Sequence, residues 1–282
     1  MKYSIGIDVG STTAKIVLID EKENILFSAY ERHFSKVREK CGELLERAGE
    51  IVGDEKVCFA VSGSAGLGIA EAIGVPFIQE VISEGEVVKK HESDTSCIIE
   101  LGGEDAKIIF LEGGADERMN GSCAGGTGAF IDQMATLLDV STEELDELSL
   151  NYTRIYPIAS RCGVFAKTDI QPLINQGAKK EDIARSIYQA VVNQTIAGLA
   201  QGRAIKGKVM FLGGPLSFCR GLRECFKETL GLSEENAIFP EYGKISVALG
   251  AAYYGAGLKQ IHRKGAFGQN CLCKNFKRFT DS

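Results

Sequence analysis

Several features that are common in proteins are missing or scarce in this chain of 282 residues. It has no tryptophan and only 5 prolines, and none of its apolar runs approaches the roughly 18 residues that a membrane-spanning helix needs. The formal net charge is −6, so nucleic acid finds no favourable electrostatic footprint. The amino terminus runs into a strand pattern without a signal-peptide pattern. We therefore expect a soluble cytoplasmic protein that binds neither membranes nor nucleic acid.

Three histidines, His33, His91 and His262, show no metal-ligand spacing and receive no role.

Cysteine is present in an odd number. The nine cysteines are scattered through segments with helix and strand patterns, which suits a reducing compartment better than a disulfide framework. Two of them, Cys271 and Cys273, form a close pair in a polar tail, where a metal site and a plain tail are both open interpretations. We expect core or surface thiols at Cys41, Cys58, Cys97, Cys219 and Cys225.

The strongest internal signal is a gapless repeat at an offset of 92 residues. Residues 8–17 (DVGSTTAKIV) lie over residues 100–109 (ELGGEDAKII). Each copy has an apolar strand that ends in an acidic residue, then a tight glycine turn and a second apolar strand, which predicts two copies of one β-hairpin. A repeat of this spacing predicts two related α/β domains, each built around its hairpin.

The remaining segments fit the same organisation. The last helix, at about Ile245–Ala256, is rich in alanine and glycine and can therefore pack closely against its neighbours. Apolar spacing predicts helices over 37–51, 130–138 and 183–199, and short buried strands at Val57–Val61 and Lys208–Leu212.

These elements define a domain map. We place a first domain at residues 1–93, completed by the C-terminal helix 245–258, and a second domain at residues 94–244. Residues 259–282 are polar and basic, and we interpret them as a tail or linker, which suits one part of a longer polypeptide.

Glycine turns at strand ends suggest phosphate binding. Only glycine lets the backbone approach a phosphate closely, and Gly10-Ser11-Thr12-Thr13 adds hydroxyls to such a turn. An ordinary hairpin turn would explain Gly10 and Ser11 equally well on their own. A second loop, Gly102-Gly103-Glu104-Asp105, and a third glycine turn, Gly213-Gly214-Pro215, favour the phosphate interpretation. Lys15 follows the first loop and could contact a phosphate. We prefer the alternatives that it faces solvent or has a structural role.

Carboxylates beside such loops have a separate use. Asp8 and Asp105 could hold Mg²⁺ through water and orient an attacking water, and Glu104 is then a candidate base. Glu100 occupies the position of Asp8 in the second copy, although a surface charge at a strand end explains it as well.

Several motifs resemble a known superfamily. Residues 7–12 (IDVGST), 101–107 (LGGEDAK) and 212–214 (LGG) resemble the two phosphate motifs and the adenosine motif of the acetate and sugar kinase, heat-shock ATPase and actin superfamily. Residues 120–128 (NGSCAGGTG) and 160–166 (SRCGVFA) resemble its activator ATPases of 2-hydroxyacyl-CoA dehydratases, which are related to the ATPase subunits of benzoyl-CoA reductase.

The resemblance covers about residues 3–256 and implies an α/β fold of two actin-like (ribonuclease H-like) domains with a nucleotide cleft between them. Stand-alone activators carry glutamine at the position of Glu104, and residues 158–172 are more similar to the activator domains at the front of large fused dehydratase-activator polypeptides. This similarity favours a natural context in which the chain is one part of a fused polypeptide.

Two cysteines fall inside the activator motifs. A 4Fe-4S cluster needs four thiolates, and Cys123 with Cys162 supplies two, so a homodimer would complete the set. Each cysteine precedes a segment with a helical pattern, and the positive end of a helix lowers a thiol pKa and favours an anionic cluster. Buried free thiols are the alternative explanation. The resemblance implies one cluster shared by two identical subunits. It also implies that the angle between the helices that flank the cluster changes with the bound nucleotide.

These features lead to a functional hypothesis. We expect an ATPase coupled to electron transfer, which uses MgATP to pass a low-potential electron from ferredoxin or flavodoxin, through its 4Fe-4S cluster, to a 2-hydroxyacyl-CoA dehydratase or related reductase. Binding of MgATP between the domains would change their relative angle and reorient the helices at the cluster. The alternatives are a small-molecule kinase of the same superfamily, acting on a sugar or carboxylate, and a nucleotide-gated scaffold ATPase.

Overall fold

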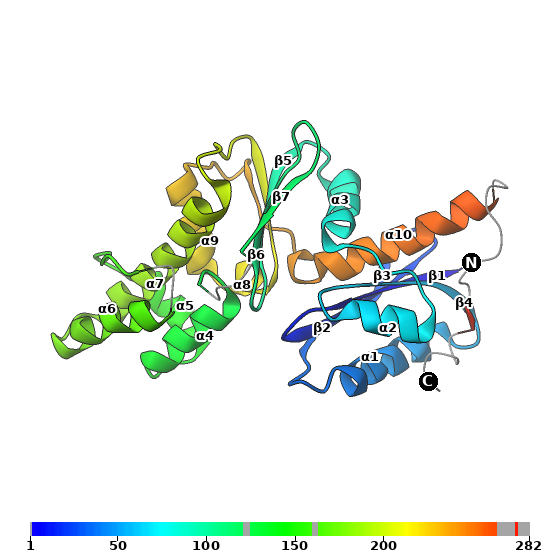
Figure 1. Ribbon diagram of the computed structural model, residues 1–282, viewed down its shortest axis with the longest axis horizontal. Coiled ribbons are helices and arrows are strands. Elements are labelled where there is room, and N and C mark those ends of the chain that lie inside the picture. The colour runs from blue at the N-terminus through cyan, green and yellow to red at the C-terminus, as the bar shows by residue number, and fades with distance from the viewer. Residues whose placement is uncertain (1, 121–124, 160–162, 264–273, 276–282) are drawn as a thin grey trace. The chain divides into compact units, whose positions relative to one another are not determined.

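The computed structural model describes residues 2–120, 125–159, 163–263 and 274–275 (Figure 1). The chain divides into two compact units, of which unit 1 comprises Met1–Ser93 with Ile245–Ser282 and unit 2 comprises Asp94–Lys244. The C-terminal helix therefore belongs to the same unit as the N-terminal strands. Within the described ranges, no helix is long and apolar enough to cross a membrane.

Unit 1 is built on a mixed β-sheet with the strand order β10-β4-β1-β2-β3. β1 pairs antiparallel with β2 and parallel with β4, and this register places Asp8 opposite Lys15. The apolar residues at alternate positions of β1, such as Ile5 and Ile7, are buried in the core beneath α1 and α2. The strands are β1 (Tyr3–Val9), β2 (Thr13–Asp20), β3 (Ile25–Arg32), β4 (Lys56–Ser62) and β10 (Lys274–Asn275).

Helices cover both faces of this sheet. In Figure 1, α1 and α2 lie on one face, whereas α10 lies on the other with α3 beside it. A β-carbon at Gly6 would overlap the α10 backbone at Ala248, so the glycine permits close packing of strand and helix. This confirms the close packing predicted for the last helix. The helices are α1 (Val37–Val52), α2 (Gly66–Ile73), α3 (Glu80–His91) and α10 (Ser246–Arg263).

Unit 2 repeats the plan with the strand order β7-β6-β5-β8-β9. β5 pairs antiparallel with β6 and parallel with β8, so β5, β6 and β8 correspond to β1, β2 and β4 of unit 1. Its register places Glu100 opposite Lys107, 92 residues beyond the pair formed by Asp8 and Lys15. The two predicted hairpins are therefore confirmed. The strands are β5 (Thr95–Leu101), β6 (Ala106–Phe110), β7 (Asp116–Met119), β8 (Lys208–Leu212) and β9 (Ala237–Ile238).

A large apolar core joins the helices of unit 2 to one face of its sheet. Local signals fix several helix ends: Ser141 Oγ accepts a hydrogen bond of 3.0 Å from the Glu144 N–H at the start of α5, and Gly231 ends α9 in the left-handed conformation. The helices are α4 (Gly128–Leu137), α5 (Thr142–Ser149), α6 (Gly163–Asn175), α7 (Lys180–Thr195), the π-helix η1 (Ile196–Ala200), α8 (Gly214–Phe218) and α9 (Arg220–Leu230).

Most of the predicted elements are present, with two differences at their edges. Ile51, the last residue of the helix predicted over 37–51, is 42% exposed, and the helix continues to Val52, which is buried. The last helix continues to Arg263, so the predicted tail begins several residues too early at 259. An apolar pattern predicts the presence of a helix more reliably than its end, because helix ends fray and their position varies by one or two residues.

Candidate functional site

The first predicted phosphate loop is the tight turn between β1 and β2. The Gly10 N–H donates a 3.0 Å hydrogen bond to the Thr13 carbonyl, which closes the turn. Ser11 is exposed at its tip, and Thr12 is half-buried. The turn therefore presents backbone and hydroxyl groups of small residues, as the sequence predicted for a phosphate contact.

Asp8 lies at the end of β1 beside this loop and is buried. Its Oδ2 accepts a 2.8 Å ion-paired hydrogen bond from Lys15 Nζ. The Lys15 side chain is only 16% exposed, so it does not extend into solvent, and the ion pair gives it the structural role that we preferred. The pair places one carboxylate and one ammonium group directly next to the loop.

The second predicted phosphate loop has the same backbone turn. The Gly102 N–H donates to the Asp105 carbonyl at 2.8 Å, which matches the bond from Gly10 to Thr13. The Asp105 carboxylate folds back over Gly102, where any β-carbon would overlap it, and Glu104 is exposed at the tip. Two carboxylates thus occupy the positions that Thr12 and Thr13 hold in the first loop.

Glu100 and Lys107 form the counterpart of the pair in unit 1. Lys107 Nζ donates to Glu100 Oε2, and the two side chains are 2% and 12% exposed. The alternative interpretation of Glu100 as a surface charge at a strand end is therefore wrong. The repeat indicates that Lys107 faces Glu100, but it does not show that the pair is buried, because burial depends on the packing of unit 2.

The third glycine turn joins β8 to α8. Gly213 has φ of 93°, and a β-carbon there would overlap the Leu101 carbonyl oxygen, so glycine is required on both counts. The Gly213 N–H donates to the Gly243 carbonyl at 3.0 Å, and Gly214 and Pro215 begin α8. The structure therefore places the predicted adenosine motif against the strand that ends in the second loop.

Unit 1 contains an equivalent glycine that the sequence analysis did not single out. Gly63 follows β4 as Gly213 follows β8, and it has the same φ of 93°. A β-carbon there would overlap Val9 O and Asp8 Oδ1. The signal was a buried strand that ends in a glycine, the same signal that was noticed only at Gly213.

A helix of unit 2 is anchored on the second loop. The N–H groups of Gly128 and Ala129, in the first turn of α4, donate to the Gly102 and Gly103 carbonyls at 3.0 and 2.8 Å. These donors have no partner within their own helix, so the loop satisfies two groups that every helix leaves open. A β-carbon at Gly128 would lie 3.3 Å from Pro215 Cγ, so the third glycine turn also approaches this helix start. Local patterns could not predict these contacts.

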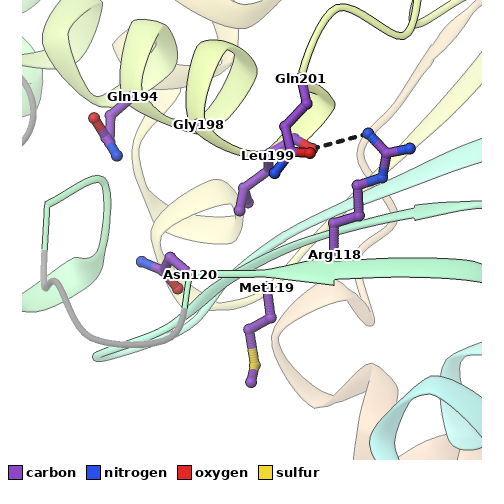
Figure 2. Close-up of a pocket in the computed structure, with 7 residues that line it drawn as sticks. All are labelled: Arg118, Met119, Asn120, Gln194, Gly198, Leu199 and Gln201. Atoms are coloured by element: carbon purple, nitrogen blue, oxygen red, sulfur yellow. Dashed lines mark hydrogen bonds between the residues drawn. The ribbon is translucent and has the colours of Figure 1, made fainter.

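A cavity of about 560 Å³ opens in unit 2 between the end of β7 and η1 (Figure 2). The Arg118 guanidinium donates to the Ala200 carbonyl at 2.8 Å, and Asn120 Oδ1 accepts a 2.6 Å bond from the Ala106 N–H. Asn120 is the first residue of the motif at residues 120–128, but none of the predicted site residues is among the described walls of the cavity. Its lining consists of Arg118, Met119, Asn120, Gln194, Gly198, Leu199 and Gln201.

The predicted cluster ligands, Cys123 and Cys162, lie outside the described residues, as do Cys271 and Cys273. Their flanking helices are described: α4 begins at Gly128, and α6 begins at Gly163, directly after Cys162 in the sequence. A β-carbon at Gly163 would lie 2.9 Å from Gln133 Oε1 of α4, so the start of α6 lies against that helix.

The other five cysteines are free and buried, so they are core thiols and a surface position is excluded. Burial raises the thiol pKa to about 11 at Cys41 and Cys219 and to about 12 at Cys97 and Cys225. Since the thiolate is the form that ligates a metal, these four are poor ligands and serve as small core residues.

Known proteins resemble the chain over most of its length. The sequence pattern of the BadF/BadG/BcrA/BcrD ATPase family matches residues 5–255. The (R)-2-hydroxyglutaryl-CoA dehydratase activating ATPase of Acidaminococcus fermentans is 33% identical over 257 residues, covering 89% of this chain and 96% of that protein. The crystal structure of component A of that dehydratase, from the same organism, has a TM-score of 0.81 at 28% identity and covers 92% of this chain and 100% of the other.

Two further structures bear on ligand and fold. The activator of 2-hydroxyisocaproyl-CoA dehydratase from Clostridium difficile, solved with bound ADPNP, has a TM-score of 0.77 at 26% identity and covers 95% of this chain and 100% of the other. A ROK family glucokinase from Streptomyces griseus shares the fold alone, with a TM-score of 0.51 at 14% identity over 89% of this chain and 98% of the other. The predicted actin-like α/β fold is confirmed. The chain is an ATPase and belongs to the BadF/BadG/BcrA/BcrD ATPase family.

Proposed function

We propose that this ATPase is an electron-transfer activator of a 2-hydroxyacyl-CoA dehydratase or related reductase. In this proposal two copies of the chain share one 4Fe-4S cluster, a ferredoxin or flavodoxin supplies the electron, and ATP hydrolysis drives its transfer to the acceptor, which is separate or fused. The named activity of the 33% identical relative supports the acceptor class. The ADPNP-bound activator structure supports ATP as the nucleotide.

The nucleotide roles rest on the two hairpin turns and the third glycine turn. We assign phosphate contacts to the loops 10–13 and 102–103, and adenosine contacts to 213–215. Asp8 and Asp105 would hold Mg²⁺ through water, since carboxylates beside phosphate loops commonly do so. Glu104 is exposed at its loop tip and so can reach a water molecule as general base.

The observation that carries the coupling is the anchoring of α4 on the second loop. The carbonyls of Gly102 and Gly103 hold the first N–H groups of the helix at 3.0 and 2.8 Å. Cys123 precedes this helix by only a few residues. A change of the loop on nucleotide binding or hydrolysis would therefore act on the start of α4, and through it on the segment with Cys123, over a short hydrogen-bonded connection.

The sequence positions of the two proposed ligands support an iron–sulfur cluster. Cys123 and Cys162 each come shortly before a helix start, where the positive partial charge favours thiolates. A 4Fe-4S cluster held there would accept and release one electron, and four thiolates from two copies would complete its ligand set. Val164 and Phe165, which follow Cys162, are 71% and 65% exposed, an apolar surface suited to a second copy.

Iron content tests the cluster assignment. We would purify the chain anaerobically, reconstitute it, and measure iron and acid-labile sulfide for wild type, Cys123→Ala and Cys162→Ala, with Cys97→Ala as the control from the buried cysteines. About two irons per chain in a dimer are expected for a shared 4Fe-4S cluster, with loss in the first two variants only. Equal iron in all variants, or none in wild type, would refute electron transfer and leave a kinase or scaffold ATPase.

Hydrogen exchange tests the coupling separately. Addition of ADPNP should change the exchange of amides in the first turn of α4, beginning with Gly128 and Ala129, because their acceptors belong to the proposed phosphate loop. The amides of α9, in the same unit, should be unaffected. Exchange in α4 that is unchanged by a bound nucleotide would contradict the connection between loop and helix.

A further inference from the structure

His33, to which the sequence analysis gave no role, contacts the first phosphate loop with both main chain and side chain. It follows β3 and is buried, with 5% of its surface exposed. Its ring Nε2 lies 3.1 Å from the Gly10 carbonyl oxygen, and its own N–H donates to the Thr12 carbonyl at 3.2 Å. Two carbonyls of the loop are therefore bound to one residue.

The partners of the ring define its tautomer. A carbonyl oxygen only accepts hydrogen bonds, so Nε2 must carry a proton to bond with Gly10. On the other side, the Ser35 N–H donates to Nδ1 at 3.2 Å, so Nδ1 must be unprotonated. Both ring nitrogens thus have roles that only the neutral ring with the proton on Nε2 can fill.

The chain bends sharply directly after His33 and holds the ring against the loop. Phe34 and Ser35 have φ values of 46° and 64°, in the left-handed region that residues with side chains rarely adopt. The Lys36 N–H then donates to the His33 carbonyl at 2.7 Å, which closes the bend before α1 begins. The hydrogen bond from Ser35 to Nδ1 lies within this bend, so the same geometry holds the ring in place.

We propose that His33 is a positioning residue for nucleotide binding, which aims the Ser11 N–H at a phosphate. The C=O of Gly10 and the N–H of Ser11 belong to one planar trans peptide and point in opposite directions. With the carbonyl fixed by Nε2 of the buried His33, the amide hydrogen of Ser11 points away from the ring at the exposed tip of the loop. An ordered N–H is what a phosphate contact needs, and the inference rests on the proposed role of this loop.

Two substitutions separate the two ring nitrogens. His33→Gln places an amide donor near the position of Nε2 and loses the acceptor at Nδ1, whereas His33→Asn places an acceptor near Nδ1 and cannot reach Gly10. His91→Asn is the matched control, because His91, on α3 of the same unit, has an equivalent contact away from the loop: its Nε2 lies 2.9 Å from the Tyr253 hydroxyl on α10. We would measure the Kd for ADPNP and for adenosine by calorimetry, together with kcat and KM for ATP.

His33→Asn should weaken ADPNP binding and raise KM by roughly three- to tenfold, as expected for the loss of one buried hydrogen bond. Adenosine binding and the kcat should stay close to wild type, and His33→Gln should restore most of the ADPNP affinity. Wild-type affinity in His33→Asn would overturn the proposal, as would equal loss of ADPNP and adenosine in both variants. A wild-type protein that binds no ADPNP would instead overturn the proposed nucleotide site itself, and this inference with it.

Discussion

Removal of the carboxylate from the buried pair of unit 2 should destabilise the protein strongly. In Glu100→Gln, Lys107 keeps its charge while its side chain is 2% exposed, so water cannot replace the lost partner. Breaking a buried ion pair on one side costs about 3–5 kcal/mol, and we expect a loss in this range. In the double variant Glu100→Leu with Lys107→Met, both charges are removed together, and the loss should be much smaller.

The assay must suit a chain without tryptophan, so urea unfolding would be followed by far-UV circular dichroism. The control is Glu234→Gln, which removes one of the two carboxylate partners of Lys227, at a glutamate that is 85% exposed. It should cost less than about 1 kcal/mol. If Glu100→Gln costs no more than this control, the buried charge of Lys107 is stabilised by something other than Glu100. The reasoning from burial would then be refuted.

Two further predictions concern backbone geometry and acid stability. Gly213→Ala should destabilise the protein by about 2–5 kcal/mol, because the new side chain meets both a left-handed φ and the Leu101 carbonyl. Gly231→Ala should cost about 1 kcal/mol in the same urea assay, because its φ is also positive but no atom lies near the new β-carbon. The backbone N–H of Thr153 donates to the Asp182 carboxylate and holds its pKa below the usual value. The ionised carboxylate therefore stabilises the fold at pH values above the unfolded pKa of about 4. This stabilisation is lost as the pH falls through the lower pKa of the native state. Asp182→Asn should therefore flatten the decline in melting temperature below pH 4, and an unchanged decline would contradict this.

The hairpins could be predicted from the sequence because everything that defines them is local. The repeat at an offset of 92 residues includes the first strand, the turn and the second strand without gaps, so the two hairpins must share the same strand register. Asp8 faces Lys15 and Glu100 faces Lys107 for this reason. The glycine at the end of β8 was recognised by the same local reasoning, and Gly63 could have been.

The contacts that support the loops could not be predicted in this way. The pairing of β3 with β2 brings His33 beside Gly10. The ring is held there by a bend in which Phe34 and Ser35 adopt left-handed φ values, and nothing in the sequence signals that conformation. The anchoring of α4 on Gly102 and Gly103 depends on packing between segments separated in the sequence. Such contacts arise from tertiary structure, which periodicity does not report.

The two copies of the hairpin therefore share a turn but differ in what holds it. The first loop is bound to an extension of β3 through His33, which ties it to its own sheet. The second loop is bound to the first turn of α4, a helix that leads back to Cys123 in the sequence. A movement of the first loop would be resisted by the sheet, whereas a movement of the second would be passed to a helix end. If the proposed nucleotide site is correct, these different attachments predict that the first loop holds the nucleotide in place and the second transmits its state to α4.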